Sequence, residues 1–555
     1  MSVQATFCAT LVDEWVRLGV TDAVVCAGSR STPLALPLAD RLRVHVKLDE
    51  RSGAFFALGL ALATGRPTVI CVTSGTAAAE LHPAVVEAHH AGVPLLVCTA
   101  DRPPELHDTG APQSIAQVGL FASAVRWSAF PGVPTESQES SWRPLAVRAF
   151  EEAVHGPSGP GPVHLNLEFR EPLTESAGAL PARPGPIVLG AGAAAPGRPV
   201  AMEPLRGRGM LIAGGPWALR ADPTRVAGLA DTLGWPVLAD PLSGSRLEGT
   251  IAAADAILRT EPPLPECVVL LGMPWLSRAL GGFVTRAADA GARMVVVDPR
   301  RQWADPLRVA TEFHQCDPDR WLDAALATAA PTASEWVDSW REREAKAQDA
   351  IATVLGSELS EPLVARVTHR HAAETGATLL VAASMPIRDL EWYAEACPRP
   401  PRVLANRGAN GIDGVVSTAL GVATTGEEER GTPTVALMGD LTFLHDVSGL
   451  VNLEDVPCSF VVLDNGGGGI FSFLPQATSV EPATFEQLFG TPPSSDVAAV
   501  ARGFGLRVHE VSDLTQLQEA LAAPGPALVR ALVRGRTQNV ALHEEINQAV
   551  RLALR

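Results

Sequence analysis

The stretch from residue 434 to residue 471 restricts the fold more than any other part of the chain. A strand-like apolar run at 434–438 leads into a Gly-Asp turn that ends at Asp440, and a helical pattern continues to about Leu453. A second strand-like run follows at 459–463. Because a right-handed β-α-β unit aligns its two strands in one direction, the pattern predicts neighbouring parallel strands in an α/β domain.

Oxygen donors follow both of these predicted strands. Asp440 follows the first, and Asn465, with the glycine run 466–469, follows the second. Ligands bind at the carboxyl ends of strands in such sheets, so both side chains are expected to face one crevice. A carboxylate, an amide oxygen and an approachable glycine carbonyl suit a hard cation but cannot enclose it, which favours Mg²⁺ completed by phosphate oxygens and water. We therefore predict Mg²⁺ and a diphosphate ligand here.

Part of this organisation occurs twice. Residues 20–103 repeat the arrangement of residues 376–467. The motif Ala-Leu-Gly-Leu-Ala at 57–61, for example, returns as Ala-Leu-Gly-Val-Ala at 419–423. Internal similarity of this kind predicts two related α/β domains.

Only the second copy keeps the oxygen donors. The alignment places Ser74 opposite Asp440 and Arg102 opposite Asn465. We therefore expect the metal site in the second copy alone.

Strand-like runs alternate with alanine-rich helical stretches between the two copies, which predicts a third α/β domain. A length of 555 residues suggests about three or four domains at roughly 150 residues each. We place three Rossmann-like, doubly wound domains at 1–180, 181–350 and 351–555, with a Pro- and Gly-rich stretch at 181–204 near the first boundary.

The composition of the sequence limits where the protein can be located and what it can bind. The acidic residues Asp13 and Glu14 interrupt the stretch where a signal peptide needs an apolar core, and no apolar run reaches 18 residues, so we expect a soluble, cytoplasmic protein. A net charge of −17 argues against nucleic acid or an anionic membrane as partner. The 8 cysteines form no Cys-x-x-Cys pair and are expected to be reduced core residues.

Sequence motifs in the loops that follow the predicted strands resemble those of a known enzyme family. They are Gly28-Ser29-Arg30-Ser31-Thr32-Pro33-Leu34, Asp49-Glu50-Arg51, Thr73-Ser74-Gly75-Thr76, Thr99 to Glu105, Asn406-Arg407-Gly408 and Gly439-Asp440-Leu441-Thr442-Phe443. With the Gly-Asp to Asn spacing, they resemble thiamine-diphosphate decarboxylases and carboligases. Among these, they look most like the 2-succinyl-5-enolpyruvyl-6-hydroxy-3-cyclohexene-1-carboxylate synthases of menaquinone biosynthesis.

The resemblance implies an activity. Such an enzyme decarboxylates 2-oxoglutarate with thiamine diphosphate and adds the resulting succinyl carbanion to isochorismate, a conjugate addition that must exclude water. It implies Mg²⁺, with Mn²⁺ as a substitute, and a homodimer or dimer of dimers whose active sites lie between subunits. Asp440, Asn465 and the carbonyl of Gly467 would be the metal ligands.

The resemblance also assigns cofactor residues. Glu50 matches the acid that protonates the aminopyrimidine ring, although Asp49 and Glu80 are candidates by residue type alone. Ile412 matches the apolar residue that holds the cofactor in its bent shape. The full cofactor set is Glu50, Ser74, Ile412, Gly439, Asp440, Leu441, Asn465, Gly467 and Ile470.

Anionic substrates require cations, and arginine binds carboxylates in bidentate geometry. The matching positions bring together arginines, polar partners and an apolar wall: Ser29, Arg30, Arg102, Gln113, Arg278, Ser384, Arg388, Arg407, Ile470, Phe471 and Leu474. Three positions depart from the family pattern, because Pro112, Ala383 and Asp464 each stand where asparagine is expected.

Two other interpretations compete with this one. Another member of the group, such as a 2-oxoacid decarboxylase or an acetolactate-synthase-like carboligase, needs fewer arginines in its loops. A regulatory or scaffold paralogue needs no cofactor, which the presence of Glu50, Asp440 and Asn465 disfavours.

Overall fold

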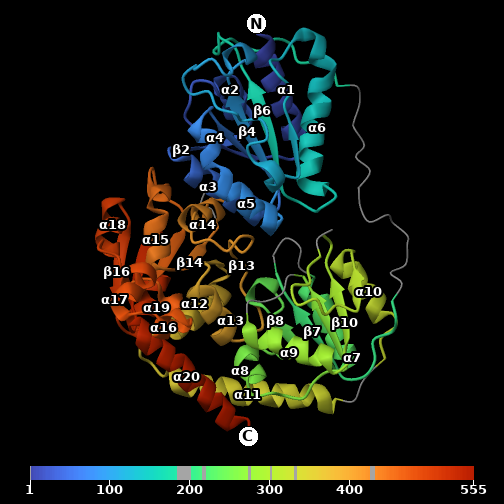
Figure 1. The fold of residues 1–555 in the computed structure, drawn as a ribbon, viewed down its shortest axis with the longest axis vertical. Helices are drawn as coiled ribbons and strands as arrows, with labels where there is room; N and C mark the ends of the chain where they lie inside the picture. The colour runs from blue at the N-terminus through green and yellow to red at the C-terminus, as the bar shows by residue number, and fades with distance from the viewer. Residues whose placement is uncertain are drawn as a thin grey trace. The chain divides into compact units, whose positions relative to one another are not determined.

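The computed structural model describes the whole chain except residues 1, 184–201, 216–220, 273–276, 301–302, 331–333 and 426–431. The chain forms two compact units (Figure 1). The first comprises Met1–Ala193, Asn406–Gly431 and His445–Val456, and the second comprises Ala194–Ala405, Thr432–Leu444 and Pro457–Arg555. Most of the Pro- and Gly-rich stretch 181–204 lies outside the described residues.

A six-stranded parallel sheet organises the first unit, in the order β2-β1-β3-β4-β6-β5. Its strands are β1 (Asp22–Cys26), β2 (Arg43–Lys47), β3 (Thr68–Val72), β4 (Leu95–Asp101), β5 (Trp127–Ala129) and β6 (Pro162–Glu168). Its helices are α1 (Val3–Arg17), α2 (Thr32–Arg41), α3 (Glu50–Thr64), α4 (Thr76–Glu80), α5 (His82–Ala91), α6 (Glu139–His155) and α14 (Val415–Ala423). Every residue of β3 and β4 is buried, as expected for a parallel sheet covered on both faces.

The second unit contains two parallel sheets. A five-stranded sheet has the order β11-β10-β9-β7-β8, and a six-stranded sheet has the order β13-β12-β14-β15-β17-β16. The strands are β7 (Gly209–Ala213), β8 (Val237–Ala239), β9 (Cys267–Leu271), β10 (Arg293–Val297), β11 (Glu312–His314), β12 (Thr378–Val381), β13 (Val403–Leu404), β14 (Thr434–Gly439), β15 (Cys458–Asp464), β16 (Arg507–Val511) and β17 (Ala527–Leu532).

The helices of the second unit differ widely in length. They are α7 (Pro223–Leu233), α8 (Ala254–Leu258), α9 (Arg278–Asp289), α10 (Pro318–Leu326), α11 (Glu335–Leu355), α12 (Glu361–Thr375), α13 (Met385–Tyr393), α15 (Asp440–His445), α16 (Gln476–Ser479), α17 (Pro482–Phe485), α18 (Val497–Gly503), α19 (Leu514–Ala522) and α20 (Arg536–Ala553). The three sheets confirm three Rossmann-like α/β domains. Each sheet falls within one of the ranges 1–180, 181–350 and 351–555, but residue 350 lies inside α11, and these limits stay predictions.

The duplication predicted from the sequence is confirmed by the sheets. Numbered in chain order, the strands of both six-stranded sheets are arranged second, first, third, fourth, sixth, fifth. Ser74 and Asp440 lie equally far beyond the first residues of β3 and β14, and Arg102 and Asn465 each directly follow β4 and β15. The two copies therefore present equivalent strand ends with different side chains.

One sequence expectation is wrong. The helical pattern does not continue to Leu453, because α15 ends at His445 and a 3-10 turn occupies Val447–Leu450. Asp446 leaves helical geometry, with φ −121 and ψ 29, and its buried side chain accepts a hydrogen bond from the backbone N–H of Ser417 (2.7 Å). A carboxylate satisfied in this way competes with continuation of the helix.

Helices α3 and α14 cross at the repeated Ala-Leu-Gly motif. A Cβ atom on Gly59 would lie 2.2 Å from the carbonyl oxygen of Thr418, and one on Gly421 would lie 2.2 Å from that of Phe56. The repeated glycines thus face each other's backbones in a symmetric contact. This close approach explains why both copies of the motif contain glycine.

We predict that Gly59→Ala and Gly421→Ala each destabilise the protein by about 1–3 kcal/mol, because a methyl group would separate the two helices. Gly228→Ala is the control, since a Cβ atom there, within α7, has no neighbour within 4 Å. Alanine is the better helix former, so this control should gain about 0.5–1 kcal/mol. Denaturant unfolding in which all three variants behave alike would contradict the prediction.

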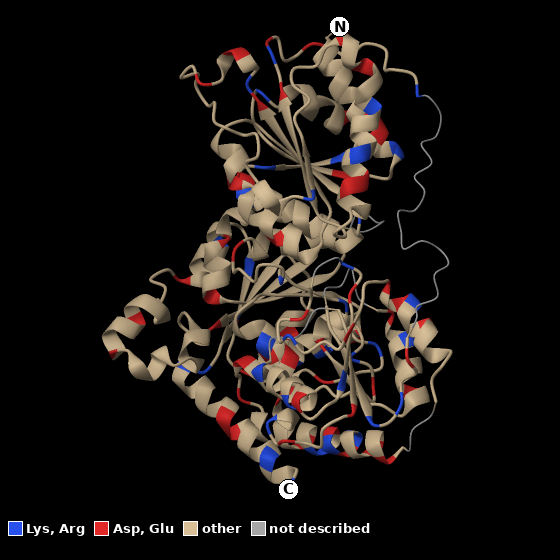
Figure 2. Cartoon of the chain, turned by 45° about the vertical axis from the view of Figure 1, so that its right-hand side comes forward, with Lys and Arg blue, Asp and Glu red and all other residues tan. Residues whose placement is uncertain are grey.

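Charged residues are distributed over many elements. Figure 2 shows acidic and basic residues interspersed along the described chain.

All eight cysteines are free thiols, of which six are buried. No helix among the described residues is long and apolar enough to cross a membrane.

Candidate active site

Asp440 occupies the carboxyl end of β14 and begins α15. Its side chain is buried and accepts backbone hydrogen bonds from Leu441 (2.6 Å), Gly467 (2.8 Å) and Gly466 (3.1 Å). Burial raises its pKa to about 6, because desolvation disfavours the carboxylate. A bound cation would offset that desolvation, so the environment of Asp440 suits a metal ligand.

Asn465 lies at the neighbouring strand end. Its Nδ2 donates a hydrogen bond to Oε1 of Glu361 (2.8 Å). Its Oδ1 is buried and has no hydrogen-bond partner among the described residues. Buried polar atoms are normally paired, so this oxygen is a vacant acceptor that fits a hard cation.

The departure at Asp464 has a structural explanation. Its carboxylate forms an ion pair with Arg530 (2.6 Å), which lies on the adjacent strand β17. The side chain is therefore engaged within the sheet rather than at the candidate metal site. Asn465 stays the predicted oxygen donor after β15.

The glycine run has a shape that excludes side chains. Gly467 has φ +123, and a Cβ atom there would lie 2.1 Å from the carbonyl oxygen of Gly490. Gly468 donates a backbone hydrogen bond to the same oxygen (2.7 Å). The loop is held against this carbonyl while its N–H groups contact Asp440. A carboxylate, a vacant amide oxygen and a glycine loop thus form one edge that fits Mg²⁺ with a diphosphate.

Several predicted substrate residues line one cavity of about 630 Å³ in the second unit. Arg278, Arg388, Ile470 and Leu474 all contribute to its wall. Ile470 follows the glycine run directly, so this cavity begins where the candidate metal loop ends. Arginine side chains and an apolar wall in one cavity suit a carboxylate on an apolar body.

Two further predicted residues, Ser384 and Phe471, do not line this cavity. Ser384 precedes α13 with φ +75, and its carbonyl oxygen accepts a hydrogen bond from Arg388. Phe471 packs against the ring of Phe489, with centroids 5.6 Å apart. Ala383, where the family has asparagine, is buried beside this turn.

Sequence reasoning missed other residues of the cavity wall. Arg259, Trp392, His543 and Asn547 also line it. His543 contacts the hydroxyl of Tyr393 (2.9 Å), and burial lowers its pKa to about 4, so the imidazole is neutral at neutral pH. No motif marks these positions. The only signal is the spacing of His543 and Asn547, which places both on one face of α20.

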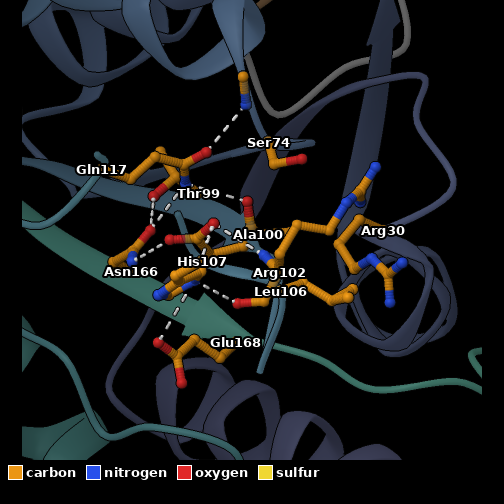
Figure 3. Close-up of polar contacts among 12 residues, drawn as sticks. Arg30, Ser74, Thr99, Ala100, Arg102, Leu106, His107, Gln117, Asn166 and Glu168 are labelled. Atoms are coloured by element: carbon orange, nitrogen blue, oxygen red, sulfur yellow. Dashed lines mark hydrogen bonds and ion pairs between the residues drawn. The ribbon is translucent and has the colours of Figure 1, made fainter. Parts of the chain in front are cut away.

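The first unit gathers a second set of predicted residues, shown in part in Figure 3. Arg30, after β1, is buried, donates to the carbonyl oxygen of Phe169 (3.0 Å) and pairs with Glu171 (3.2 Å). Its Nε is buried without a hydrogen-bond partner among the described residues. Burial lowers the pKa of Arg30, and the nearby charge of Arg102 lowers it further. Both arginines follow strands of the same sheet, and arginine side chains at such an edge suit an anionic ligand.

The loop containing Gln113 covers these strand ends. Ser74 Oγ donates to the carbonyl oxygen of Gln113 (2.8 Å), and Gln113 Nε2 donates back to that of Ser74 (2.9 Å). Arg102 donates to the carbonyl oxygen of Pro112 (3.2 and 3.3 Å). Because the backbone of Pro112 makes this contact, the replacement of asparagine does not remove it. Ser29 is exposed at the end of β1.

A buried polar network lies beneath these residues (Figure 3). Gln117 accepts from the backbone N–H of Gly75 (2.8 Å) and donates to Oδ1 of Asn166 (2.8 Å). Asn166 donates to Asp101 (2.8 Å), which accepts from the backbone N–H of Arg102 (2.7 Å). The network joins the turn after β3 to the end of β4, and it fixes the loops that carry Ser74 and Arg102.

Glu50 begins α3 at the end of β2. The neighbouring carboxylate of Asp49 caps the helix by accepting from the backbone N–H of Ser52 (2.9 Å). Glu50 is half-buried and makes no side-chain hydrogen bond to any described residue. Glu80 is exposed at the last turn of α4. Of the three candidates, Glu50 alone is both partly buried and available to a ligand.

The loop with Arg407 and Ile412 belongs to the first unit. Glu87 of α5 accepts backbone hydrogen bonds from Gly408 (2.7 Å) and Ala409 (2.6 Å). A Cβ atom on Gly408 would lie 2.5 Å from the carbonyl oxygen of Glu87, so glycine is required for this contact. Arg407 and Ile412 are both half-buried on a loop that α5 holds in place.

Comparison with known families places the chain in a class. Three family models match: "Thiamine pyrophosphate enzyme, N-terminal TPP binding domain" at residues 5–120, "Middle domain of thiamine pyrophosphate" at 196–380, and "Thiamine pyrophosphate enzyme, C-terminal TPP binding domain" at 391–531. Together with the fold and the two strand edges, they define a thiamine-pyrophosphate (thiamine-diphosphate) enzyme.

Curated relatives identify one family within this class of enzymes. The chain is 41% identical to 2-succinyl-5-enolpyruvyl-6-hydroxy-3-cyclohexene-1-carboxylate synthase of Thermobifida fusca (strain YX), with 100% of both chains covered. It is 40% identical to the synthase of Chloroflexus aurantiacus, over 98% of this chain and 96% of the relative. The synthase of Bacillus velezensis is 38% identical, over 98% and 97%. The chain belongs to the 2-succinyl-5-enolpyruvyl-6-hydroxy-3-cyclohexene-1-carboxylate synthase family.

Proposed function

We propose that the protein decarboxylates 2-oxoglutarate and adds the resulting succinyl group to isochorismate, forming 2-succinyl-5-enolpyruvyl-6-hydroxy-3-cyclohexene-1-carboxylate and CO₂ for menaquinone biosynthesis. The observation that carries this proposal is the cavity that contains Arg278, Arg388 and an apolar wall and begins directly after the Asn465 loop. Such a cavity suits an anionic acceptor beside a diphosphate site. Similarity to the named synthases over the whole chain supports it.

The residues present fit the cofactor and its metal. Asp440, Asn465 and the carbonyl of Gly467 would hold Mg²⁺ or Mn²⁺, which would offset the negative charge of the diphosphate. When bound, thiamine diphosphate would supply the nucleophilic carbon that decarboxylation of a 2-oxo acid requires. Glu50 would hold a proton at the aminopyrimidine ring. The remaining predicted cofactor contacts are Ser74, Ile412, Gly439, Leu441 and Ile470.

The arginines would recognise the substrate carboxylates. Arg30 and Arg102 form one cationic pair, and Arg278 and Arg388 lie together in the second unit. Ser29, Gln113, Ser384 and Arg407 are the other predicted polar contacts. The apolar residues Ile470, Phe471 and Leu474 would exclude water, whose entry would divert the reaction towards succinic semialdehyde.

We further propose that the enzyme works in the cytoplasm as a homodimer or a dimer of dimers. In the resembling group the first domain of one subunit faces the third domain of its partner. An isologous interface of this kind gives each dimer two equivalent sites. Glu50 of one subunit would then serve the cofactor whose metal is held by Asp440 of the other.

Isochorismate consumption tests the proposal. The purified protein should consume isochorismate only when 2-oxoglutarate, thiamine diphosphate and Mg²⁺ are all present, with equimolar release of CO₂. Release of CO₂ with succinic semialdehyde as sole product, and isochorismate left intact, would instead support a simple 2-oxoacid decarboxylase. Absence of any dependence on thiamine diphosphate would contradict both.

We predict that Arg388→Ala and Arg407→Ala each weaken use of the anionic substrates. Loss of one partner from a charged contact costs about 2 kcal/mol or more, which is roughly a 30-fold loss in kcat/KM. Affinity for thiamine diphosphate should not change. Arg148→Ala is the control, because Arg148 pairs with Glu152 on an exposed face of α6. If both variants keep wild-type KM values for both substrates, neither arginine contacts them.

A further inference from the structure

Glu361 is a buried carboxyl group beside the candidate metal loop that none of the assigned roles explains. It is 1% exposed and is the first residue of α12, which Ser360 caps. Its Oε1 accepts a hydrogen bond from Nδ2 of Asn465 (2.8 Å). The contact joins segments 104 residues apart.

This contact determines which end of the Asn465 amide is available. A carboxyl oxygen that accepts from Nδ2 forces Oδ1 to turn the other way, because a reversed amide would place two acceptor oxygens together. Oδ1 is the atom that is buried without a partner among the described residues. Glu361 therefore accounts for a vacant oxygen, rather than an N–H group, at the candidate metal site.

The backbone of the glycine run lies close to the Glu361–Asn465 pair. A Cβ atom on Gly469 would lie 2.6 Å from Nδ2 of Asn465 and 3.7 Å from Oε1 of Glu361. Even an alanine at 469 would displace the amide. The absence of a side chain here is thus a requirement of the Glu361–Asn465 contact.

Burial of Glu361 is unfavourable for stability. Removing a carboxyl group from water is costly unless hydrogen bonds replace its hydration. Among the described residues, the hydrogen bond of its side chain is the one accepted from Nδ2 of Asn465. Its presence therefore points to a role other than holding the fold together.

We propose that Glu361 is a positioning residue that fixes the Asn465 amide with Oδ1 directed at the divalent cation. The inference rests on the proposed function, because the cation is that of the thiamine-diphosphate site. Glu361 itself does not contact the metal. Groups that orient metal ligands typically contribute about 10–100-fold to metal affinity.

The test compares Glu361→Leu with Glu361→Gln in purified protein freed of cofactor and metal. Mn²⁺ binding is measured by electron paramagnetic resonance with saturating thiamine diphosphate, and the melting temperature of the metal-free protein is measured separately. Glu361→Leu should weaken Mn²⁺ binding about 10–100-fold, with a smaller effect on the melting temperature from the lost acceptor of Nδ2 of Asn465. Glu361→Gln keeps an acceptor oxygen and should stay within about threefold of the wild type.

Two further variants complete the test. Glu358→Gln is the control, since Glu358 lies three residues away in an exposed ion pair with Arg534, and its Mn²⁺ affinity should equal that of the wild type. Gly469→Ala displaces the same amide from the other side and should weaken Mn²⁺ binding as Glu361→Leu does. If Glu361→Leu does not fold, the Mn²⁺ affinity of Gly469→Ala tests the inference in its place.

Separate outcomes address the inference and the proposed function. Wild-type Mn²⁺ affinity in Glu361→Leu, or in Gly469→Ala where Glu361→Leu does not fold, overturns the inference. Equal loss of affinity in the Leu and Gln variants also overturns it, because a retained acceptor would then have no effect. If the wild-type protein binds no Mn²⁺ with thiamine diphosphate, the proposed metal site fails, and the inference fails with it.

Discussion

Replacement of Asp440 with alanine is expected to abolish Mg²⁺-dependent binding of thiamine diphosphate. Asp440 is the only carboxylate of the predicted metal site, and it also accepts the backbone N–H groups of Gly466 and Gly467 that shape the glycine loop. The variant would lose both the charge that binds the cation and the anchor of the loop. We expect a loss of about 100-fold or more in cofactor affinity.

Isothermal titration calorimetry of thiamine diphosphate with and without Mg²⁺ measures this effect. Asp464→Asn is a matched control, because Asp464 lies beside the site but pairs with Arg530. The control should keep most of its cofactor affinity. Unchanged affinity in Asp440→Ala, or a larger loss in Asp464→Asn, would show that the metal is held elsewhere.

Replacement of Glu50 with glutamine is expected to lower turnover by about 10²–10⁴-fold, the usual contribution of a positioned proton-transfer group. Cofactor affinity should fall much less, since the metal ligands are intact. Asp49→Asn provides the control, because Asp49 caps α3 and its loss should cost about 1 kcal/mol of stability rather than turnover. Wild-type turnover in Glu50→Gln would exclude Glu50 as the proton-transfer residue.

An active site shared between two subunits would make these two variants complementary. If Glu50 and Asp440 of different subunits form each site, mixing Glu50→Gln with Asp440→Ala and allowing random reassociation makes roughly half of the dimers mixed, each with one intact site. Activity should recover to roughly a quarter of the wild-type level. Verified mixed dimers with no activity would place both residues in one subunit's site.

The fold was predictable from local sequence patterns. The continuous apolar runs that became β3, β4, β14 and β15 are typical of buried parallel strands, and the repeated motif at 57–61 and 419–423 marked the duplication. Asp440, Asn465 and the arginines could be predicted as site residues because each directly follows a strand or belongs to a loop motif.

Other features depend on contacts between distant parts of the chain. Helix α15 ends where Asp446 accepts a hydrogen bond from the backbone N–H of Ser417, although the apolar periodicity of the sequence continues. Glu361 contacts Asn465 across 104 residues, and Gln117 contacts Asn166 across 49. Arg259 has no flanking motif. No local sequence motif marks these positions, and their roles depend on contacts that form only in the folded chain.

The most direct test of the proposed reaction is mass spectrometry of the product formed from fully ¹³C-labelled 2-oxoglutarate and unlabelled isochorismate. The proposed reaction predicts one adduct that retains every labelled carbon of the donor except its 1-carboxyl, which leaves as labelled CO₂. Its formation should require thiamine diphosphate and Mg²⁺. Labelled succinic semialdehyde as the only product, with isochorismate unchanged, would contradict the proposed carboligation.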